Sequence, residues 1–191
     1  SVNNVVSFAS SKDGSKTNKL FYRRLLSSRI ELLEDSEIQI LVEDARNYHQ
    51  LNHALTSIQP EVIVHLAAVS HANQSNKDPH TTFDHSLRTL ENALDWARGS
   101  KAHFIYMSSS MVYGHFKEES VNEDALCQPL GIYGALKFAG EKIVEAYNQV
   151  FDLPYTIIRP SALYGERCVS RRVTQIFVEK ALSKEPIIVN G

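Results

Sequence analysis

Short apolar segments alternate with helix-patterned segments along most of this chain, and this alternation restricts its fold more than any other feature. Val62–Leu66 and Phe104–Met107 are apolar on both faces, which is typical of strands buried in a parallel sheet. Between them, apolar residues recur at intervals of three and four from Phe83 to Ala97, as on one face of a long helix. Strand–helix–strand units of this kind need crossover connections and therefore predict a parallel sheet.

The alternation continues on both sides of this unit. Further strands are predicted at Ile38–Val42 and Tyr155–Arg159, and the apolar run Ile187–Val189 is compatible with one more. Helices are predicted over 17–28, 51–58, 133–150 and 173–182. The predicted class is α/β, a doubly wound parallel sheet with helices on both sides. Because ligands of such sheets bind beyond the carboxyl ends of the strands, the residues after each strand are the candidates for function.

Composition excludes several classes of protein. The chain has 191 residues, 43% of them hydrophobic and 22% charged, which suits a globular domain rather than a disordered one. A net charge of −2 argues against nucleic acid or an acidic membrane surface as a partner. The two cysteines make no disulfide framework, and no apolar run reaches the roughly 20 residues of a spanning helix. These observations favour a cytoplasmic protein.

A tyrosine and a lysine are the first candidates for chemistry. Tyr133 and Lys137 lie four apart in a helical pattern, so that the phenol and the ammonium share one helix face. A free tyrosine, with a pKa of about 10, is a poor base at neutral pH, but a neighbouring cation lowers that pKa. The pair is therefore suited to take the proton of an alcohol that is being oxidised. A second pair of the same spacing, Tyr113 and Lys117, contains Gly114 and favours a turn.

A serine-rich segment accompanies this pair. Ser108–Ser110 begins at the carboxyl end of a predicted strand. A serine hydroxyl both donates and accepts, so it can hold a substrate hydroxyl against Tyr133, although a polar strand-to-loop transition is the simpler explanation of a serine run taken alone. The chain has no Gly-x-Ser-x-Gly motif, which argues against a serine hydrolase.

Two histidines have the spacing of a zinc-binding helix. His49 and His53 are four apart, but Gln50 stands where zinc proteases carry their glutamate. No third ligand is evident in the sequence, and no metal site is predicted.

Several motifs between residues 38 and 191 follow one another in a characteristic order. They are Val42–Asn47, Pro60–Ala68, Ser108–Gly114, Pro129 with Tyr133–Lys137 and Glu141, Leu153–Pro154, Ile158–Pro160 and Leu163–Gly165. In this order and spacing the chain resembles the NAD-dependent epimerase/dehydratase branch of the extended short-chain dehydrogenase/reductase family. Each motif is modest alone, whereas the ordered set is specific.

The resemblance implies a role for each matching residue. Tyr133 would be the catalytic base or acid, Lys137 would lower its pKa and hold the nicotinamide ribose, and Ser109 would bind the sugar hydroxyl. The implied NAD contacts are Asp44, Ala45, Leu66, Ala67, Ala68, Tyr133, Lys137, Pro160 and Ser161. The implied substrate contacts are Ser109, Ser110, Arg167 and Arg172. The two arginines are suited to a diphosphate, but a solvated basic helix start is the alternative for them.

In the family, bound NAD⁺ takes a hydride from a sugar carbon while the tyrosine takes the hydroxyl proton, and epimerases re-reduce the keto-sugar from the other face. Family dehydratases carry Asp-Glu directly after the hydroxyl residue, where this chain has Ser110 and Met111, which argues against dehydration. His85 replaces a common asparagine, and either relays a proton or is simply solvated.

The family's glycine-rich phosphate loop is missing from these 191 residues. By the family's order it is expected before Ser1, together with the residue that separates NAD from NADP. Residues 1–160 are therefore interpreted as an incomplete NAD-binding Rossmann-like domain and 161–191 as the start of a substrate-binding lobe. This piece alone is expected to bind NAD poorly.

The leading hypothesis from the sequence is an NAD(P)-dependent nucleotide-sugar epimerase. A nucleotide-sugar 4-reductase or a dehydratase of the same family and a non-catalytic nucleotide-binding relative are the alternatives. The resemblance also implies a homodimer through the helices at about 83–98 and 133–150.

Overall fold

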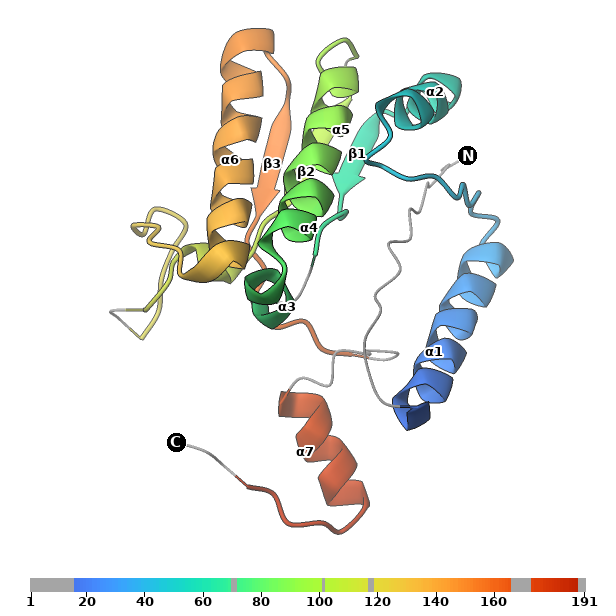
Figure 1. The fold of residues 1–191 in the computed structure, drawn as a ribbon, viewed down its shortest axis with the longest axis vertical. Helices are drawn as coiled ribbons and strands as arrows, with labels where there is room; N and C mark the ends of the chain where they lie inside the picture. The colour runs from blue at the N-terminus through green and yellow to red at the C-terminus, as the bar shows by residue number, and fades with distance from the viewer. Residues whose placement is uncertain (1–15, 70–71, 101, 117–118, 166–172, 189–191) are drawn as a thin grey trace. The chain divides into compact units, whose positions relative to one another are not determined.

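The computed structural model describes residues 16–69, 72–100, 102–116, 119–165 and 173–188 (Figure 1). Of these, residues 40–161 form one compact unit, and residues 16–39 with 162–188 belong to a second. The second unit holds two helices, α1 (Lys16–Asp35) and α7 (Val173–Leu182). The predicted helix at 173–182 is confirmed, and the one predicted at 17–28 extends further.

A three-stranded parallel sheet lies at the centre of the first unit. Its strands are β1 (Val62–His65), β2 (His103–Met107) and β3 (Tyr155–Ile158), in the order β1-β2-β3. Ile63 is paired with Phe104, and Phe104 in turn with Tyr155. The predicted α/β class with a parallel sheet is confirmed, and these three strands lie within a residue of the predicted ranges.

The connections between the strands are helical. Between β1 and β2 lie α3 (Ala72–Lys77), α4 (Pro79–Phe83), a π-helical turn (Asp84–Arg88) and α5 (Thr89–Ala97). Between β2 and β3 lie a short 3-10 turn (Ser110–Val112) and α6 (Gly131–Phe151). A further helix, α2 (Tyr48–Ile58), precedes β1. Asn47 caps α2, because its side chain accepts the Gln50 N–H. The long helix predicted from residue 83 is thus interrupted by a π-helical turn.

Helices α5 and α6 lie against the same face of the sheet (Figure 1). Both crossovers advance in one direction along the order β1-β2-β3, and right-handed crossovers then place their helices on one side. Within the described residues of this unit, Val62 and Val64 on the other face are half exposed. The second helical layer of a doubly wound sheet is therefore not present in that part of the chain.

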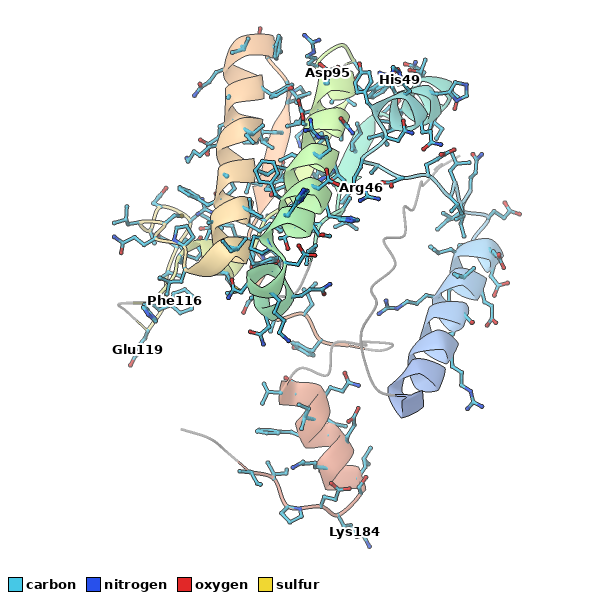
Figure 2. All side chains as sticks on the ribbon, in the orientation of Figure 1. Arg46, His49, Asp95, Phe116, Glu119 and Lys184 are labelled. Atoms are coloured by element: carbon cyan, nitrogen blue, oxygen red, sulfur yellow. The ribbon has the colours of Figure 1, made fainter. Side chains whose placement is uncertain are left out.

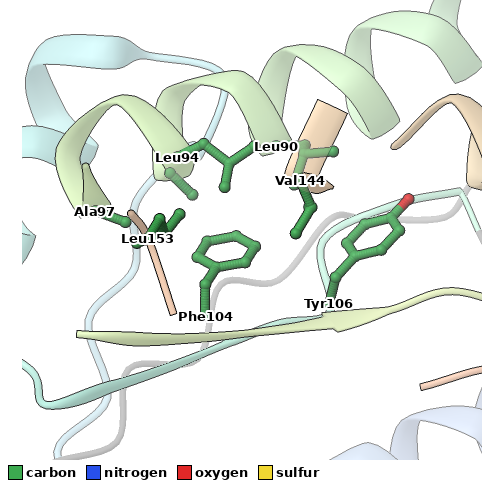
Figure 3. Close-up of a cluster of buried hydrophobic side chains, with 8 residues drawn as sticks. Leu90, Leu94, Ala97, Phe104, Tyr106, Val144 and Leu153 are labelled. Carbon is green, nitrogen blue, oxygen red and sulfur yellow. The ribbon is translucent and has the colours of Figure 1, made fainter. Parts of the chain in front are cut away.

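The core fills the space between these helices and the sheet (Figure 3). It consists of Leu90, Ala93, Leu94 and Ala97 of α5, Val144 of α6, Leu153, and Phe104 and Tyr106 of β2. Gly140 of α6 contacts the Tyr106 hydroxyl so closely that a Cβ atom there would collide with it. A side chain at this position would push α6 away from the sheet.

The prediction of a strand at Ile38–Val42 is wrong. These residues are not assigned to a strand, and the described sheet holds only β1, β2 and β3. Val42 is 80% exposed. A β-branched run forms a strand only where a neighbouring strand pairs with it, and none of the described strands pairs with this segment. Ile187 and Ile188 are likewise not in a strand, and Val189 lies outside the described residues. The predicted domains, 1–160 and 161–191, stay a prediction.

Candidate functional site

Three loops meet at the carboxyl edge of the parallel sheet. Leu66, Ala67 and Ala68 follow β1, Ser108, Ser109 and Ser110 follow β2, and Pro160 and Ser161 follow β3. The Ser108 N–H donates to Ile158 O at 2.8 Å, and the Ser110 N–H donates to Pro160 O at 2.9 Å. The fold therefore brings these predicted site residues to one edge of the sheet, where ligands of open α/β folds bind.

Helix α6 presents a stripe of functional side chains to this edge. Tyr133, Lys137 and Glu141 lie at successive intervals of four, which places them on one face of the helix. Gly134 allows this face to approach the loop after β2, since a Cβ atom there would lie 2.9 Å from Met111 O. Residue 134 thus has to be small for α6 to reach the serine segment.

Lys137 joins α6 to the end of β2. Its Nζ atom donates a hydrogen bond to Met107 O at 2.6 Å and lies 5.2 Å from the centre of the Tyr106 ring. Only 6% of the residue is exposed, and this burial lowers the pKa of its ammonium to about 8. At pH 7 the charged form still predominates about tenfold. A cation is therefore held one helical turn from Tyr133, which is partly buried.

Ser109 is held by its own turn. Its hydroxyl oxygen accepts the Met111 N–H at 3.2 Å and caps the 3-10 turn, and the residue is 8% exposed. Among the described residues its O–H proton has no recorded acceptor, which leaves that donor for a ligand. Ser110 is partly buried beside it.

A buried ion pair, which sequence reasoning missed, lies behind the serine segment. The Arg159 guanidinium donates from Nε and one terminal nitrogen to both Glu141 carboxylate oxygens, at 2.9 and 2.8 Å. The Ser108 hydroxyl also donates to Glu141. In the sequence, Glu141 is noted only as the residue four after Lys137. No neighbouring residue indicates that it pairs with Arg159, which lies 18 residues further along the chain.

Asp44 lies in a small charged cluster. Its carboxylate accepts from Arg46, with the nearest atoms 2.6 Å apart, and this hydrogen bonding lowers the pKa of Asp44 to about 2. Arg46, labelled in Figure 2, also reaches Asp84 at 3.2 Å and His85 Nε2 at 3.1 Å. His85 is therefore partly buried and in contact with a guanidinium, and its role as a proton relay stays a prediction. Ala45 is buried next to this cluster.

His65, at the end of β1, is buried between aromatic rings. Its ring is stacked on Phe104 and Tyr106, with centroids 5.9 and 6.1 Å apart. Burial, and secondarily the charge of Lys137, lowers the pKa of His65 to about 3. The Nε2 atom has no hydrogen-bond partner within the described part of the chain. The imidazole is therefore neutral at physiological pH.

The donors at the carboxyl edge fit the hydroxyl-rich part of a dinucleotide. Lys137 uses one N–H on Met107 O and has two more to offer, and the Tyr133 and Ser109 hydroxyls lie on the adjoining elements. Ala67 and Ala68, directly after β1, have small side chains and are partly buried. Arg167 and Arg172, predicted for the diphosphate, lie outside the described residues.

A cavity of about 550 Å³ lies in the segment that follows the serines. Tyr113, Phe116, Val121, Asp124, Leu126 and Gln128 are among its lining residues. Phe116 is labelled in Figure 2 and is 58% exposed. None of these residues was predicted to belong to the site.

Neither a metal site nor a membrane-spanning helix is evident in the residues that the structure describes. No three His, Cys, Asp or Glu side chains gather there in an arrangement that could hold a metal ion. None of the helices in that part of the chain is both long and apolar enough to span a membrane.

The parallel sheet, its crossovers and the loops at its carboxyl edge define a Rossmann-like α/β protein. Residues 4–191 match the model of the NAD dependent epimerase/dehydratase family, and the chain belongs to that family. It is thus homologous to NAD-dependent nucleotide-sugar epimerases and dehydratases.

Similar proteins agree with this assignment. The chain is 31% identical over 133 residues to an uncharacterized UDP-glucose epimerase of Bacillus subtilis, covering 69% of this chain and 42% of the relative. It is 32% identical over 136 residues to a putative UDP-glucose 4-epimerase of Methanocaldococcus jannaschii, covering 69% and 45%. The chain therefore spans less than half the length of these relatives.

A solved structure shares the fold. The UDP-glucuronic acid 4-epimerase of Bacillus cereus, in complex with UDP-glucuronic acid and NAD, superposes with a TM-score of 0.76 at 30% identity. The match covers 88% of this chain and 54% of that enzyme. This homologous structure therefore holds both a dinucleotide and a nucleotide-sugar.

Proposed function

We propose that this chain carries the catalytic face of an NAD(P)-dependent nucleotide-sugar epimerase. One observation supports this most strongly: the Lys137 ammonium reaches Met107 O at 2.6 Å, so that the Tyr133–Lys137 face of α6 lies against the serine segment after β2. A base, a cation and a hydroxyl that holds substrate then adjoin the edge of the sheet where a dinucleotide would bind.

The proposed reaction is a transient oxidation of a sugar hydroxyl. NAD, when bound, supplies the hydride acceptor and later the hydride donor for the sugar carbon. The Tyr133 phenol oxygen takes the proton of the sugar hydroxyl as that carbon is oxidised, and returns it when the keto-sugar is reduced. Ser109 orients the hydroxyl through the O–H proton that its capping bond leaves unused. Lys137 holds its positive charge one helical turn from Tyr133, where it stabilises the negative charge of the oxygen that accepts the proton.

The residues after Ser109 favour epimerisation over dehydration. Elimination of water needs an acid and a base beside the sugar, and Ser110 and Met111 supply neither at neutral pH. Supplying NADPH with a keto-sugar separates an epimerase from a 4-reductase, because only a reductase consumes the cofactor.

The substitution Tyr133→Phe tests the proposal in the full chain. It removes the proton acceptor and keeps the ring, so turnover of a UDP-sugar should fall at least a hundredfold. NAD and UDP-sugar binding, measured by calorimetry, should change by less than about threefold. Tyr164→Phe, at a residue that is 76% exposed, is the matched control. Full activity of the Tyr133 variant would refute the assignment.

A further inference from the structure

The ion pair between Glu141 and Arg159 is buried more deeply than an ordinary surface pair. Glu141 is fully buried, and only 17% of the Arg159 side chain is exposed. A carboxylate in such a place is tolerated only when charge and hydrogen bonds compensate for the lost water. Here the two Arg159 bonds and the Ser108 hydroxyl provide that compensation.

Arg159 has a second set of contacts, which reach the described parts of the loop after the 3-10 turn, residues 113–116 and 119–128. One terminal nitrogen donates to the Tyr113 hydroxyl at 3.1 Å and to Glu123 O at 2.9 Å, and the guanidinium lies 5.0 Å from the Tyr113 ring centre. The loop is closed at its base, because Gly114, with φ of +73°, packs directly on the Gln128 carbonyl. A single guanidinium thus holds the loop both at its start and near its far end.

Glu141 has a corresponding contact on the catalytic side. The Ser108 hydroxyl donates to its carboxylate from the residue next to Ser109. Glu141 also follows Lys137 by one helical turn on the stripe that contains Tyr133. The carboxylate therefore joins the backbone that carries Ser109 to the helix that carries the base.

We propose that Glu141 and Arg159 are positioning residues. Their buried pair holds Ser109 against the Tyr133–Lys137 face of α6, and it holds the segments 113–116 and 119–128 next to that face. The positioning of Ser109, which we call the seat, rests on the proposed function. The hold of Arg159 on the loop, which we call the clamp, is a property of the folded chain alone. A pair that merely stabilised the core would affect neither the loop selectively nor the alignment of reacting groups.

Amide hydrogen exchange tests the clamp without any substrate. Tyr113→Phe removes one bond to Arg159 and keeps the ring, and Arg159→Lys keeps the charge opposite Glu141 but loses the fork. Exchange of the hydrogen-bonded amides of Gly114 and Ala125 should accelerate about threefold in the first variant and at least about tenfold in the second.

Arg98→Lys is the matched control for exchange. Arg98 pairs with Asp95 at 2.7 Å and lies 5.1 Å from the Phe151 ring centre, but it is exposed and distant in sequence from the loop. This substitution should leave amide exchange in 113–116 and 119–128 unchanged. The clamp would be overturned if loop amides exchanged within twofold of the wild-type rate in both Tyr113→Phe and Arg159→Lys. It would also be overturned if amides throughout the core accelerated as much as those of the loop.

Steady-state kinetics of Ser108→Ala test the seat. Losing the hydroxyl that anchors the serine segment should lower kcat about tenfold, with KM for the UDP-sugar changed by less than threefold, because alignment is lost and binding is kept. An unchanged kcat would overturn the seat. A wild-type protein that turns over no nucleotide-sugar would overturn the proposed function and the seat with it, while exchange would still decide on the clamp.

Discussion

Acidification should destabilise the sheet unit through one residue, His65. The imidazole is 6% exposed, stacked between aromatic rings, and near the Lys137 ammonium, which together hold its pKa at about 3 instead of 6.5. Between these two values the unfolded chain binds a proton that the folded chain does not. The free energy of unfolding therefore falls as the pH falls below about 6.5.

The size of the effect follows from the two pKa values. Between pH 7.5 and pH 5, protonation of the unfolded-state imidazole lowers the free energy of unfolding by about 2 kcal/mol, while the folded-state imidazole stays neutral throughout. Asp44 and Lys137 do not add to this change, since their pKa values of about 2 and about 8 lie outside the window. The urea midpoint should accordingly fall by about 1 M.

The fluorescence of Trp96, the chain's one tryptophan, provides the assay. Trp96 packs against the core cluster and its indole N–H donates to the Thr56 hydroxyl at 3.0 Å, so its emission reports on unfolding of this unit. His65→Phe keeps a flat ring and removes the titration. Its urea midpoint should therefore stay nearly constant across the same pH range, whereas that of wild type falls by about 1 M. Equal pH dependence in the two proteins would refute the reasoning.

Three further predictions concern packing, catalysis and assembly. Gly140→Ala should destabilise the sheet unit by about 1–3 kcal/mol in urea, because the added methyl meets the Tyr106 hydroxyl. Gly99→Ala should cost less than about 1 kcal/mol, because its methyl makes only an ordinary contact with Trp96 O at 3.7 Å, and equal effects of the two substitutions would contradict this. Turnover should decline above pH 8 as the Lys137 ammonium loses its proton. Lys137→Arg should move this decline to higher pH, because a guanidinium stays charged there, and a decline at the same pH in the variant would exclude Lys137 as its source. Light scattering should report a dimer formed through α5 and α6, and a monomeric wild-type protein would contradict this prediction. Val150→Glu should weaken the dimer, because Val150 of α6 is an apolar side chain that is 69% exposed in the single chain.

Local pattern predicted much of the fold. The strands around residues 62–66 and 104–107 are recognisable because buried parallel strands are apolar on both faces, and the helix at 133–150 because one face repeats every three to four residues. The positions of the candidate site followed from the strand ends, since parallel strands all end at one edge. The prediction of a strand at 38–42 was wrong because a strand forms only when a neighbouring strand pairs with it, and local pattern does not show whether such a neighbour is present.

Long-range contacts were beyond the reach of the same reasoning. Glu141 and Arg159 are 18 residues apart, and Arg46 reaches Asp84 across 38. Nothing in the sequence around these residues indicates which opposite charge each of them contacts. Only the packing of α6 on β2 and β3 removes water from Glu141 and makes Arg159 its partner.

Pattern along the chain was sufficient to predict the class of fold, the three strands of the sheet and the spacing of Tyr133 and Lys137, because these depend on periodicity and on neighbours in the sequence. Which groups lose their contact with water follows only from tertiary packing. His65 became a neutral imidazole, Lys137 a cation with a lowered pKa, and Glu141 a buried anchor. Burial is a property of the whole packed unit, and the free energy of a charge depends on what surrounds it in space.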